Sequence, residues 1–380
     1  MVAFLLLFWA VYGGMHFYLY SKLRQSNLLH GGLSIAAVCF LTFMVLAPLL
    51  AVLLDRAGAF WAAWSVSIVG HSWMAIIWWF CVLALLGDLW NLALRGLSLL
   101  TPAAKSLVLP PGPALAAIGV LVVMAAAWGV YEASAIRLKR LDVASTRIPQ
   151  GSAPLRVVQI SDIHLGLIVR GGRLRKVLKL VEEAQPDLLV STGDLVDASF
   201  SHLEKEAGML AQLRPPLGKF AVLGNHEFYA GLDNALKMHD AAGFRLLRGE
   251  CVTLAYGVRL AGVDDPAGRV VGRELFLEEG GALFGSEHTK LTIFLKHRPD
   301  VSEASVGLFD LQLSGHTHGG QIFPFGLLSA LGNQYLKGFH RLGGGSAIYV
   351  TLGAGTWGPP MRLLAPPEVT LIIIRPAKGH

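Results

Sequence analysis

Long apolar runs are confined to the first third of this 380-residue chain, and they constrain its fold more than any other feature. With 53% hydrophobic residues and a mean hydropathy of +0.53, the chain is too apolar for an ordinary soluble protein. A helix needs roughly 20 apolar residues to cross a bilayer. Four stretches are long enough, near residues 2–20, 31–54, 60–87 and 113–131. We therefore predict four transmembrane helices within residues 1–131.

Positive charge is also concentrated in the apolar part of the chain. Residues 1–150 carry nine Lys/Arg against four Asp/Glu, whereas residues 151–380 carry 23 against 22. The pI near 9.3 therefore reflects loops that flank a membrane, and we expect no nucleic acid as a partner. The basic residues on the two sides of the spans are nearly equal in number, which leaves the membrane side of the carboxy-terminal part undecided. The three cysteines provide neither a disulfide framework nor a cysteine-rich zinc motif.

A polar segment rich in Pro, Gly and Ser separates the apolar part from a globular region. We expect a juxtamembrane linker over residues 132–154 and a globular domain over residues 155–380. Strand-like and helical stretches alternate at first, at 155–160, 173–184, 187–192, 202–213 and 219–223. Strand-like sequence then dominates, at 252–256, 258–263, 291–296, 308–313, 347–352 and 370–374. The pattern predicts an α/β domain of two packed β-sheets flanked by helices.

Five short motifs that bear histidine, aspartate or asparagine follow one another in the globular region. They are Asp162-Ile163-His164, Gly193-Asp194, Gly224-Asn225-His226-Glu227, Lys296-His297 and Gly315-His316-Thr317-His318. Each motif begins where a predicted strand ends, and open α/β sheets bind their ligands at the carboxyl ends of strands. A core histidine or a solvated aspartate accounts for any single motif but not for all of them. The combination predicts a hydrolytic site that holds two metal ions.

Phosphoester hydrolysis explains why imidazole, carboxylate and amide ligands would be needed together. Two divalent ions about 3.5–4 Å apart provide a nucleophilic water near neutral pH and neutralise the phosphoryl oxygens. A carboxylate can bridge both ions, and a mixture of imidazole and oxygen ligands suits Mn, Fe, Zn or Co better than Mg or Ca alone. We therefore expect two divalent metal ions as cofactors, with manganese among the candidates.

The ordered pattern D-x-H, G-D-x-x-D, G-N-H-E, H and G-H-x-H resembles the calcineurin-like metallophosphoesterase superfamily, over roughly residues 155–375. The resemblance implies the calcineurin-like fold and a metal-dependent hydrolase acting on phosphoester or phosphoanhydride bonds. It also implies seven metal ligands, namely Asp162, His164 and His318 on the first ion, Asn225, His297 and His316 on the second, and Asp194 as the bridge between them.

Two further residues of the motifs are implied to act in catalysis. His226 would face the phosphate as leaving-group acid or oxyanion stabiliser, and Asp197 would orient it. Ala198-Ser199 follow Asp197 where Ser/Thr protein phosphatases carry Arg-Gly, so we do not expect protein dephosphorylation. Arg362, which lies between two prolines, could clamp a substrate phosphate, as arginine does bidentately, or it could be a surface residue.

Residues 315–321 and 353–367 resemble the bacterial membrane-associated branch of the superfamily, which includes phosphodiesterases and lipid-A-pathway pyrophosphatases. The expected protein is a multi-pass phosphodiesterase or pyrophosphatase of the bacterial inner membrane. Its expected partners are membrane lipids and a phosphoester substrate, and the membrane anchor favours a lipid-linked one. Two alternatives stay open: a phosphodiesterase or nucleotidase acting on soluble nucleotides, and a non-catalytic membrane sensor or scaffold. The sequence does not indicate an oligomeric state.

Three weaker features have both a functional and a structural interpretation. The apolar segment at 322–328 directly follows the last metal motif, and it could admit acyl chains, enter the bilayer or pack as an ordinary loop. The basic stretch at 170–179 could meet anionic head groups or be a solvated helix face. His16 and His71 lie within predicted spans, where polar packing between helices is favoured over a proton path or a transport role.

Overall fold

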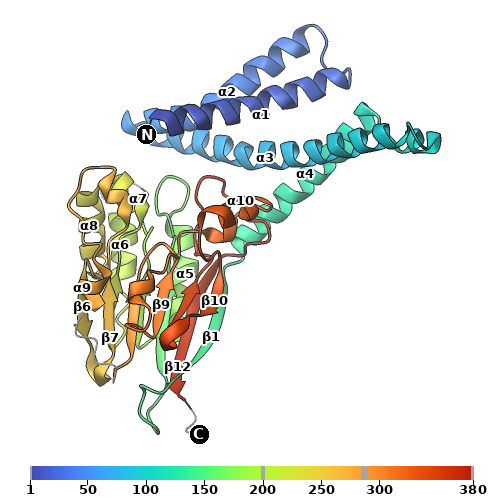
Figure 1. Cartoon of the computed structure of the whole chain (residues 1–380). Helices are drawn as coiled ribbons and strands as arrows, with labels where there is room; N and C mark the ends of the chain where they lie inside the picture. Colours follow the sequence, from blue (N-terminus) through green and yellow to red (C-terminus); the bar gives the residue numbers. More distant parts are fainter. Residues whose placement is uncertain (1, 198–201, 284–289, 378–380) are drawn as a thin grey trace. The chain divides into compact units, whose positions relative to one another are not determined.

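The computed structural model describes residues 2–197, 202–283 and 290–377, and the chain divides into two compact units (Figure 1). The first unit comprises Met1–Val130 with Gly358–Met361, and the second comprises Tyr131–Trp357 with Arg362–His380. The first unit is helical, whereas the second contains both β-sheets. The second unit carries all five metal motifs.

The apolar part folds into long helices: α1 (Val2–Gln25), α2 (Gly32–Arg56), α3 (Phe60–Leu97) and α4 (Pro111–Ser134). Within the described residues, α2, α3 and α4 are long and apolar enough to cross a membrane. Helix α1 is not among them. The predicted number of four spans is therefore corrected to three candidate spans in the part of the chain that the structure describes.

Helix α3 continues well beyond the span predicted at 60–87. Its 38 residues rise over about 57 Å at 1.5 Å each, which is nearly twice the roughly 30 Å of bilayer hydrocarbon. Asp88, at which the apolar run was expected to end, accepts a hydrogen bond of 2.6 Å from the Tyr18 hydroxyl of α1 and also pairs with Lys22. Polar contacts between α1 and α3 therefore accommodate Asp88 within the helix, just beyond the predicted end of the span.

The two histidines within the apolar helices form packing contacts. The Nδ1 atom of His16 lies 2.7 Å from the Tyr12 carbonyl oxygen, and its Nε2 atom accepts a bond of 2.9 Å from the Trp73 indole. The Nδ1 atom of His71 lies 2.8 Å from the Ser67 carbonyl oxygen. These contacts are those of polar packing within and between helices.

Two six-stranded sheets form the second unit (Figure 1). The first has the order β1-β12-β2-β3-β4-β5 and is built from Arg137–Ser145, Glu368–Pro376, Leu155–Ile160, Leu188–Ser191, Lys219–Ala221 and Arg245–Leu246. The second has the order β10-β11-β9-β8-β7-β6 and is built from Gly338–Arg341, Ala347–Val350, Leu311–Ser314, Thr292–Leu295, Arg259–Gly262 and Glu250–Thr253. The predicted fold class, α/β with two sheets and flanking helices, is confirmed.

Alternating residues of the strands bury both faces of the first sheet. Val157 belongs to the core shared with the second sheet, where Leu260 and Ile293 lie. Its neighbour Val158 belongs to the core on the opposite face, together with Leu174 of helix α5 (Gly171–Ala184). Because successive side chains of a strand point to opposite faces, one short apolar run supplies both cores. Other helices of this unit are α6 (Glu204–Ala211), α7 (Asn225–Ala230), α8 (Leu232–Ala241), α9 (Glu279–Leu283) and α10 (Phe325–Gly332).

The segment expected to be a linker contains strand β1. It pairs in parallel with β12 over the register Arg137↔Glu368 to Ser145↔Pro376. Only Ala135 and Ile136 separate the end of α4 from the start of β1. The catalytic sheet therefore begins directly after a candidate membrane-spanning helix.

Candidate metal centre

The metal motifs follow the ends of five strands of the two sheets. Strands β2, β3 and β4 are parallel neighbours, and so are β8 and β9. Parallel neighbours present their carboxyl ends at the same edge. The residues that follow these strands are Asp162 after β2, Asp194 after β3, Asn225 after β4, His297 after β8 and His316 after β9.

The structure brings all seven predicted ligands together. The side chains of Asp162, His164 and His318 place one ligand atom each within 4.8 Å of one another, and so do those of Asp194, His297 and His316. Asn225 joins the second group, because its Oδ1 atom lies 3.2 Å from the His297 Nε2 atom. Asp194 lies between the groups, with its Oδ2 atom 3.2 Å from His297 Nε2 and 3.8 Å from His164 Nε2.

Hydrogen bonds on the far side of two imidazoles leave their Nε2 atoms available for a metal. The Nδ1 atom of His297 lies 2.8 Å from the Thr192 carbonyl oxygen, which can only accept a hydrogen bond, so Nδ1 carries the proton. The Nδ1 atom of His164 lies 3.0 Å from the Asp197 Oδ1 atom. Such contacts fix the tautomer and the ring orientation of a ligating histidine. Asp197 therefore has a second role besides the predicted contact with His226.

Backbone strain is concentrated at the site. Five of the ten non-glycine residues with positive φ in the described part of the chain are candidate ligands, with φ from 49° to 73°: Asp162, His164, Asp194, His316 and His318. Residues with a β-carbon seldom adopt this region, and each such residue costs about 1–3 kcal/mol. The surrounding sheets therefore hold the ligands in conformations that the free chain would avoid.

The donor set fits a pair of divalent cations. One buried carboxylate oxygen, Asp162 Oδ2, has no hydrogen-bond partner. The Nε2 atoms of His164 and His318 face each other at 3.0 Å. A β-carbon at Gly224 would overlap the Asp194 carboxylate, and one at Gly315 would overlap that of Asp162. Glycine at these two positions therefore leaves room for both carboxylates to point into the centre.

Charges in the centre are strongly coupled. Burial would raise the pKa of Asp194, but the imidazoles of His297 and His226 hold it well below its ordinary value. Burial raises the pKa of Asp162. Burial would lower the pKa of His226, but the carboxylates of Asp194 and Asp197 outweigh the effect of burial and raise this pKa to about 9. Buried carboxylates that attract positive charge in this way are suited to binding divalent cations.

Comparisons with known proteins agree with this geometry. A family model described as calcineurin-like phosphoesterase matches residues 155–320. An uncharacterised metallophosphoesterase of Aquifex aeolicus is 41% identical over 261 residues, which cover 68% of this chain and 99% of the relative. The chain belongs to the calcineurin-like metallophosphoesterase family.

A zebrafish (Danio rerio) transmembrane protein with a metallophosphoesterase domain is 32% identical over 62% of this chain and 57% of its own length. An uncharacterised Campylobacter jejuni relative is 33% identical over 64% of this chain and 66% of its own length.

As a metallophosphoesterase, the chain is a metal-dependent hydrolase of phosphoester bonds. The bound ions of such a centre neutralise phosphoryl oxygens and lower the pKa of water. Three of the chain's described helices are long and apolar enough to cross a membrane, and the zebrafish relative is named as a transmembrane protein.

Glu227 is a positioning residue of the metallophosphoesterase site that the sequence analysis did not assign. Its buried carboxylate accepts backbone hydrogen bonds of 2.6–3.2 Å from the amides of Asp194, Leu195, Val196 and Gly224. It thereby ties the loop after β3, which carries Asp194, to the loop after β4, which carries Asn225. Its place in the Gly-Asn-His-Glu motif was the available signal, but only the fold shows which amides it binds.

Arg362 occupies a different position from the one that a phosphate clamp would need. Its side chain is fully buried, and its guanidinium donates to the carbonyl oxygens of Leu352, Gly355 and Ala365. Its Nη2 atom also lies 3.0 Å from His318 Nδ1. The guanidinium is enclosed by these groups and does not face a substrate, so the clamp interpretation is corrected. Burial, aided by the nearby Arg173, lowers its pKa to about 9.

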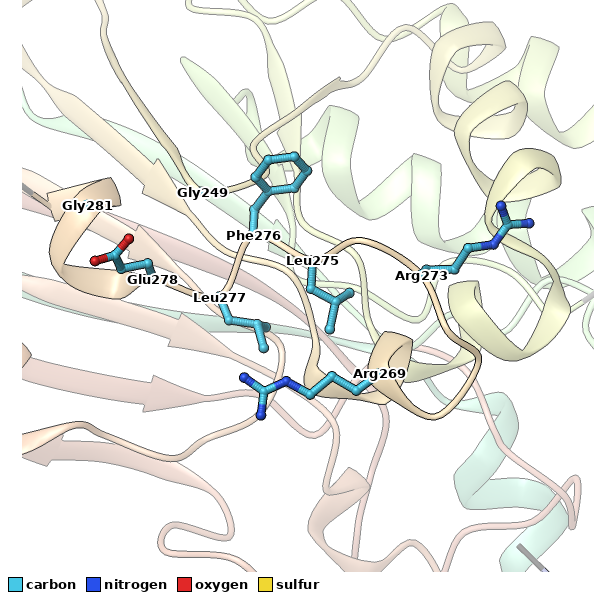
Figure 2. A pocket seen from close by; sticks show the side chains of 8 residues that line it. All are labelled: Gly249, Arg269, Arg273, Leu275, Phe276, Leu277, Glu278 and Gly281. Carbon is cyan, nitrogen blue, oxygen red and sulfur yellow. The ribbon is translucent and has the colours of Figure 1, made fainter.

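A hollow of about 660 Å³ in the metallophosphoesterase domain lies beside the loop that precedes α9 (Figure 2). Two arginines, Arg269 and Arg273, line it together with Phe276 and Glu278. None of the candidate ligands lines it, nor does His226. This hollow is therefore separate from the metal centre.

Proposed function

We propose that this metallophosphoesterase uses two divalent ions, held by the seven clustered ligands, to hydrolyse a phosphodiester or pyrophosphate bond of a lipid or lipid-linked substrate. The observation that carries the lipid assignment is the two-residue connection between α4 and β1. Two extended residues reach about 7 Å, so a catalytic unit on so short a tether stays at the surface of the membrane that α4 enters. A substrate of that membrane is then always within reach.

The ligand assignment to two ions has support in the position of Asp194. Its carboxylate lies near imidazoles of both groups, as a bridging ligand requires. One ion would take Asp162, His164 and His318, and the other would take Asn225, His297 and His316. The mixed nitrogen and oxygen donors favour Mn, Fe, Zn or Co.

His226 is the proposed acid for the leaving group. Its Nδ1 atom lies 2.8 Å from Asp197 Oδ1, which leaves Nε2 to hold the proton that the leaving oxygen needs. Its side chain is 16% exposed, whereas the Asp194 side chain is 2% exposed. His226 can therefore be reached by a substrate, as a general acid must be.

A soluble nucleotide is the second candidate substrate, and one observation favours it. The rings of Tyr229 and Trp357 each lie 5.6 Å from the His226 ring, and both residues are more than half exposed. Aromatic rings beside the proposed acid could stack on the base of a nucleoside leaving group.

Turnover by the purified full-length chain tests the proposal. Hydrolysis of a chromogenic phosphodiester, a lipid pyrophosphate in mixed micelles and a nucleoside diphosphate would be compared in the presence of Mn²⁺. Asp194→Asn and His226→Ala should each lower turnover by roughly two orders of magnitude or more. Asp233→Asn, at an exposed position of α8, is the matched control and should have little effect. Turnover that survives both site substitutions would contradict the assigned site, whereas preference for the nucleotide would favour the second candidate.

A further inference from the structure

We propose that helix α10 is a membrane-binding element of the catalytic unit and that its partner is a phospholipid surface. Its sequence, Phe-Gly-Leu-Leu-Ser-Ala-Leu-Gly, contains no charged residue, and none of its eight residues is buried. Leu327, Leu328 and Leu331 are 66%, 51% and 86% exposed. Soluble surfaces rarely gather large apolar side chains in this way unless a membrane or a partner covers them.

The helix differs from the other helices of the same unit in lacking a buried face. Helix α5 buries Leu174, Val177 and Val181 and turns charged residues outward. In α10, by contrast, the only polar side chain is that of Ser329. Helix α10 therefore contributes little to the core, and its apolar side chains need another explanation.

A continuous set of hydrogen bonds connects α10 to the end of α4. The Glu132 carboxylate, in the last turn of α4, accepts a bond of 2.8 Å from the Leu364 amide. The neighbouring Leu363 exchanges backbone bonds of 2.8 and 3.1 Å with Gln321 and Phe323, just before α10. The end of a candidate membrane-spanning helix and the start of α10 therefore lie at the same edge of the catalytic unit.

This shared edge identifies the occupant as lipid. Helix α4 is a candidate membrane span, so its last turn marks the level at which the chain leaves the bilayer. The apolar side chains at that edge include Leu364, which is 61% exposed, besides the leucines of α10. A short apolar helix held at this level binds the boundary between head groups and acyl chains.

The same helix adjoins the metal centre. The turn His318–Gly320 packs against α10, and a β-carbon at Gly320 would overlap the backbone of Gly326. Lipid bound by α10 would therefore lie beside the turn that carries His318. The binding of α10 to the bilayer does not depend on the proposed function. A role of α10 in helping a lipid substrate to reach the site does rest on it.

The first experiment measures insertion without reference to catalysis. The full-length chain with its three cysteines replaced by alanine would receive Leu331→Cys or, as a control of similar exposure, Tyr256→Cys. Each would carry the fluorophore NBD and be reconstituted into vesicles of phosphatidylethanolamine and phosphatidylglycerol. We expect blue-shifted emission at position 331 and quenching by doxyl-labelled lipid at least about twofold stronger than at 256. Equal, water-like emission at both positions would overturn the proposal.

A second experiment needs no cysteine replacement. Leu327→Glu combined with Leu331→Glu, both at exposed positions, should leave turnover of a soluble chromogenic phosphodiester unchanged. The same variant should lower turnover of vesicle-borne substrate about tenfold, because two carboxylates oppose insertion. Unchanged turnover on vesicles would count against α10. Insertion of α10 without any lipid hydrolysis would support this inference and reject the proposed lipid substrate. Lipid hydrolysis without insertion would support the lipid substrate and reject this inference.

Discussion

The Asp197 carboxylate lies 2.8 Å from the Nδ1 atom of His226, and both residues follow strand ends rather than lie within strands. The same oxygen also lies 3.0 Å from His164 Nδ1. One carboxylate thus orients the proposed acid and a proposed metal ligand. The two functions of the site, holding metal and protonating the leaving group, are therefore coupled through a single side chain.

Asp197→Asn should lower kcat by about 10–100-fold, because an amide orients both imidazoles less well than a carboxylate does. Combining it with His226→Ala should cost less than the product of the two single effects, since the residues act as a unit. Rates on two phosphodiesters, one with a good and one with a poor leaving group, provide the measurement. The poor leaving group should suffer more from His226→Ala. Equal losses on both substrates would argue against His226 as the acid.

Gly224→Ala should reduce metal content and turnover together, because the added methyl group would overlap the Asp194 carboxylate. Metal per protein by elemental analysis and the thermal midpoint would be measured side by side. Gly208→Ala, in α6, is the matched control because its new methyl group would meet no atom within 4 Å. The control should be neutral or stabilising by up to about 1 kcal/mol. A Gly224→Ala variant with full metal content would contradict the packing argument.

Local sequence predicted the site better than it predicted the edges of the fold. The ligand motifs were recognisable because each follows an apolar run such as Leu155–Ile160, and the run and the motif are adjacent in sequence. Strand β1 gave no such signal, since its first residues, from Arg137 to Arg140, are exposed and mostly basic. It becomes a strand by pairing with β12, which lies more than two hundred residues further along the chain.

Two other differences arise from contacts that the sequence pattern does not reveal. Arg362 lies between prolines and has the appearance of a surface residue, but carbonyl oxygens of the surrounding turns enclose it. Asp88 has the appearance of a helix end, but Lys22 and Tyr18 of another helix hold it within α3. Tyr18 and Lys22 lie 70 and 66 residues from Asp88, so no local window contains them. The carbonyl partners of Arg362 lie within ten residues of it, but only the folded turns point their carbonyl oxygens at its guanidinium.

Trp357→Ala should separate the two substrate candidates. If the Trp357 ring stacks on a base, its loss should raise KM for a nucleoside diphosphate about 3–10-fold, in line with about 0.5–1.5 kcal/mol for an aromatic pair. The KM for a substrate with an aliphatic leaving group should change little. The side-chain amide of Gln321 donates to the Trp357 carbonyl oxygen and accepts from the Trp357 amide, both at 2.9 Å. Neither bond involves the ring, so the loop should persist. A uniform change in KM would exclude stacking as the cause.

His239 should make stability depend on pH between about 6.5 and 4. Its side chain on α8 is fully buried, its Nδ1 atom lies 2.8 Å from the Ala235 carbonyl oxygen, and its Nε2 atom has no partner. Burial lowers its pKa from 6.5 to about 4. The unfolded chain therefore binds a proton at higher pH than the folded chain does. Stability should be greatest above pH 6.5 and should fall as the pH drops towards 4, by up to about 3 kcal/mol.

Denaturant unfolding of the detergent-solubilised chain at several pH values, with chelator present so that metal release does not contribute, measures this dependence. His239→Leu removes the titrating group but keeps an apolar side chain of similar size, and it should flatten the curve over that window. The variant will lose some stability near neutral pH, where the neutral imidazole makes its hydrogen bond to Ala235. The difference between the two curves should therefore shrink, or change sign, as the pH falls. Parallel curves would mean that His239 is not the titrating group.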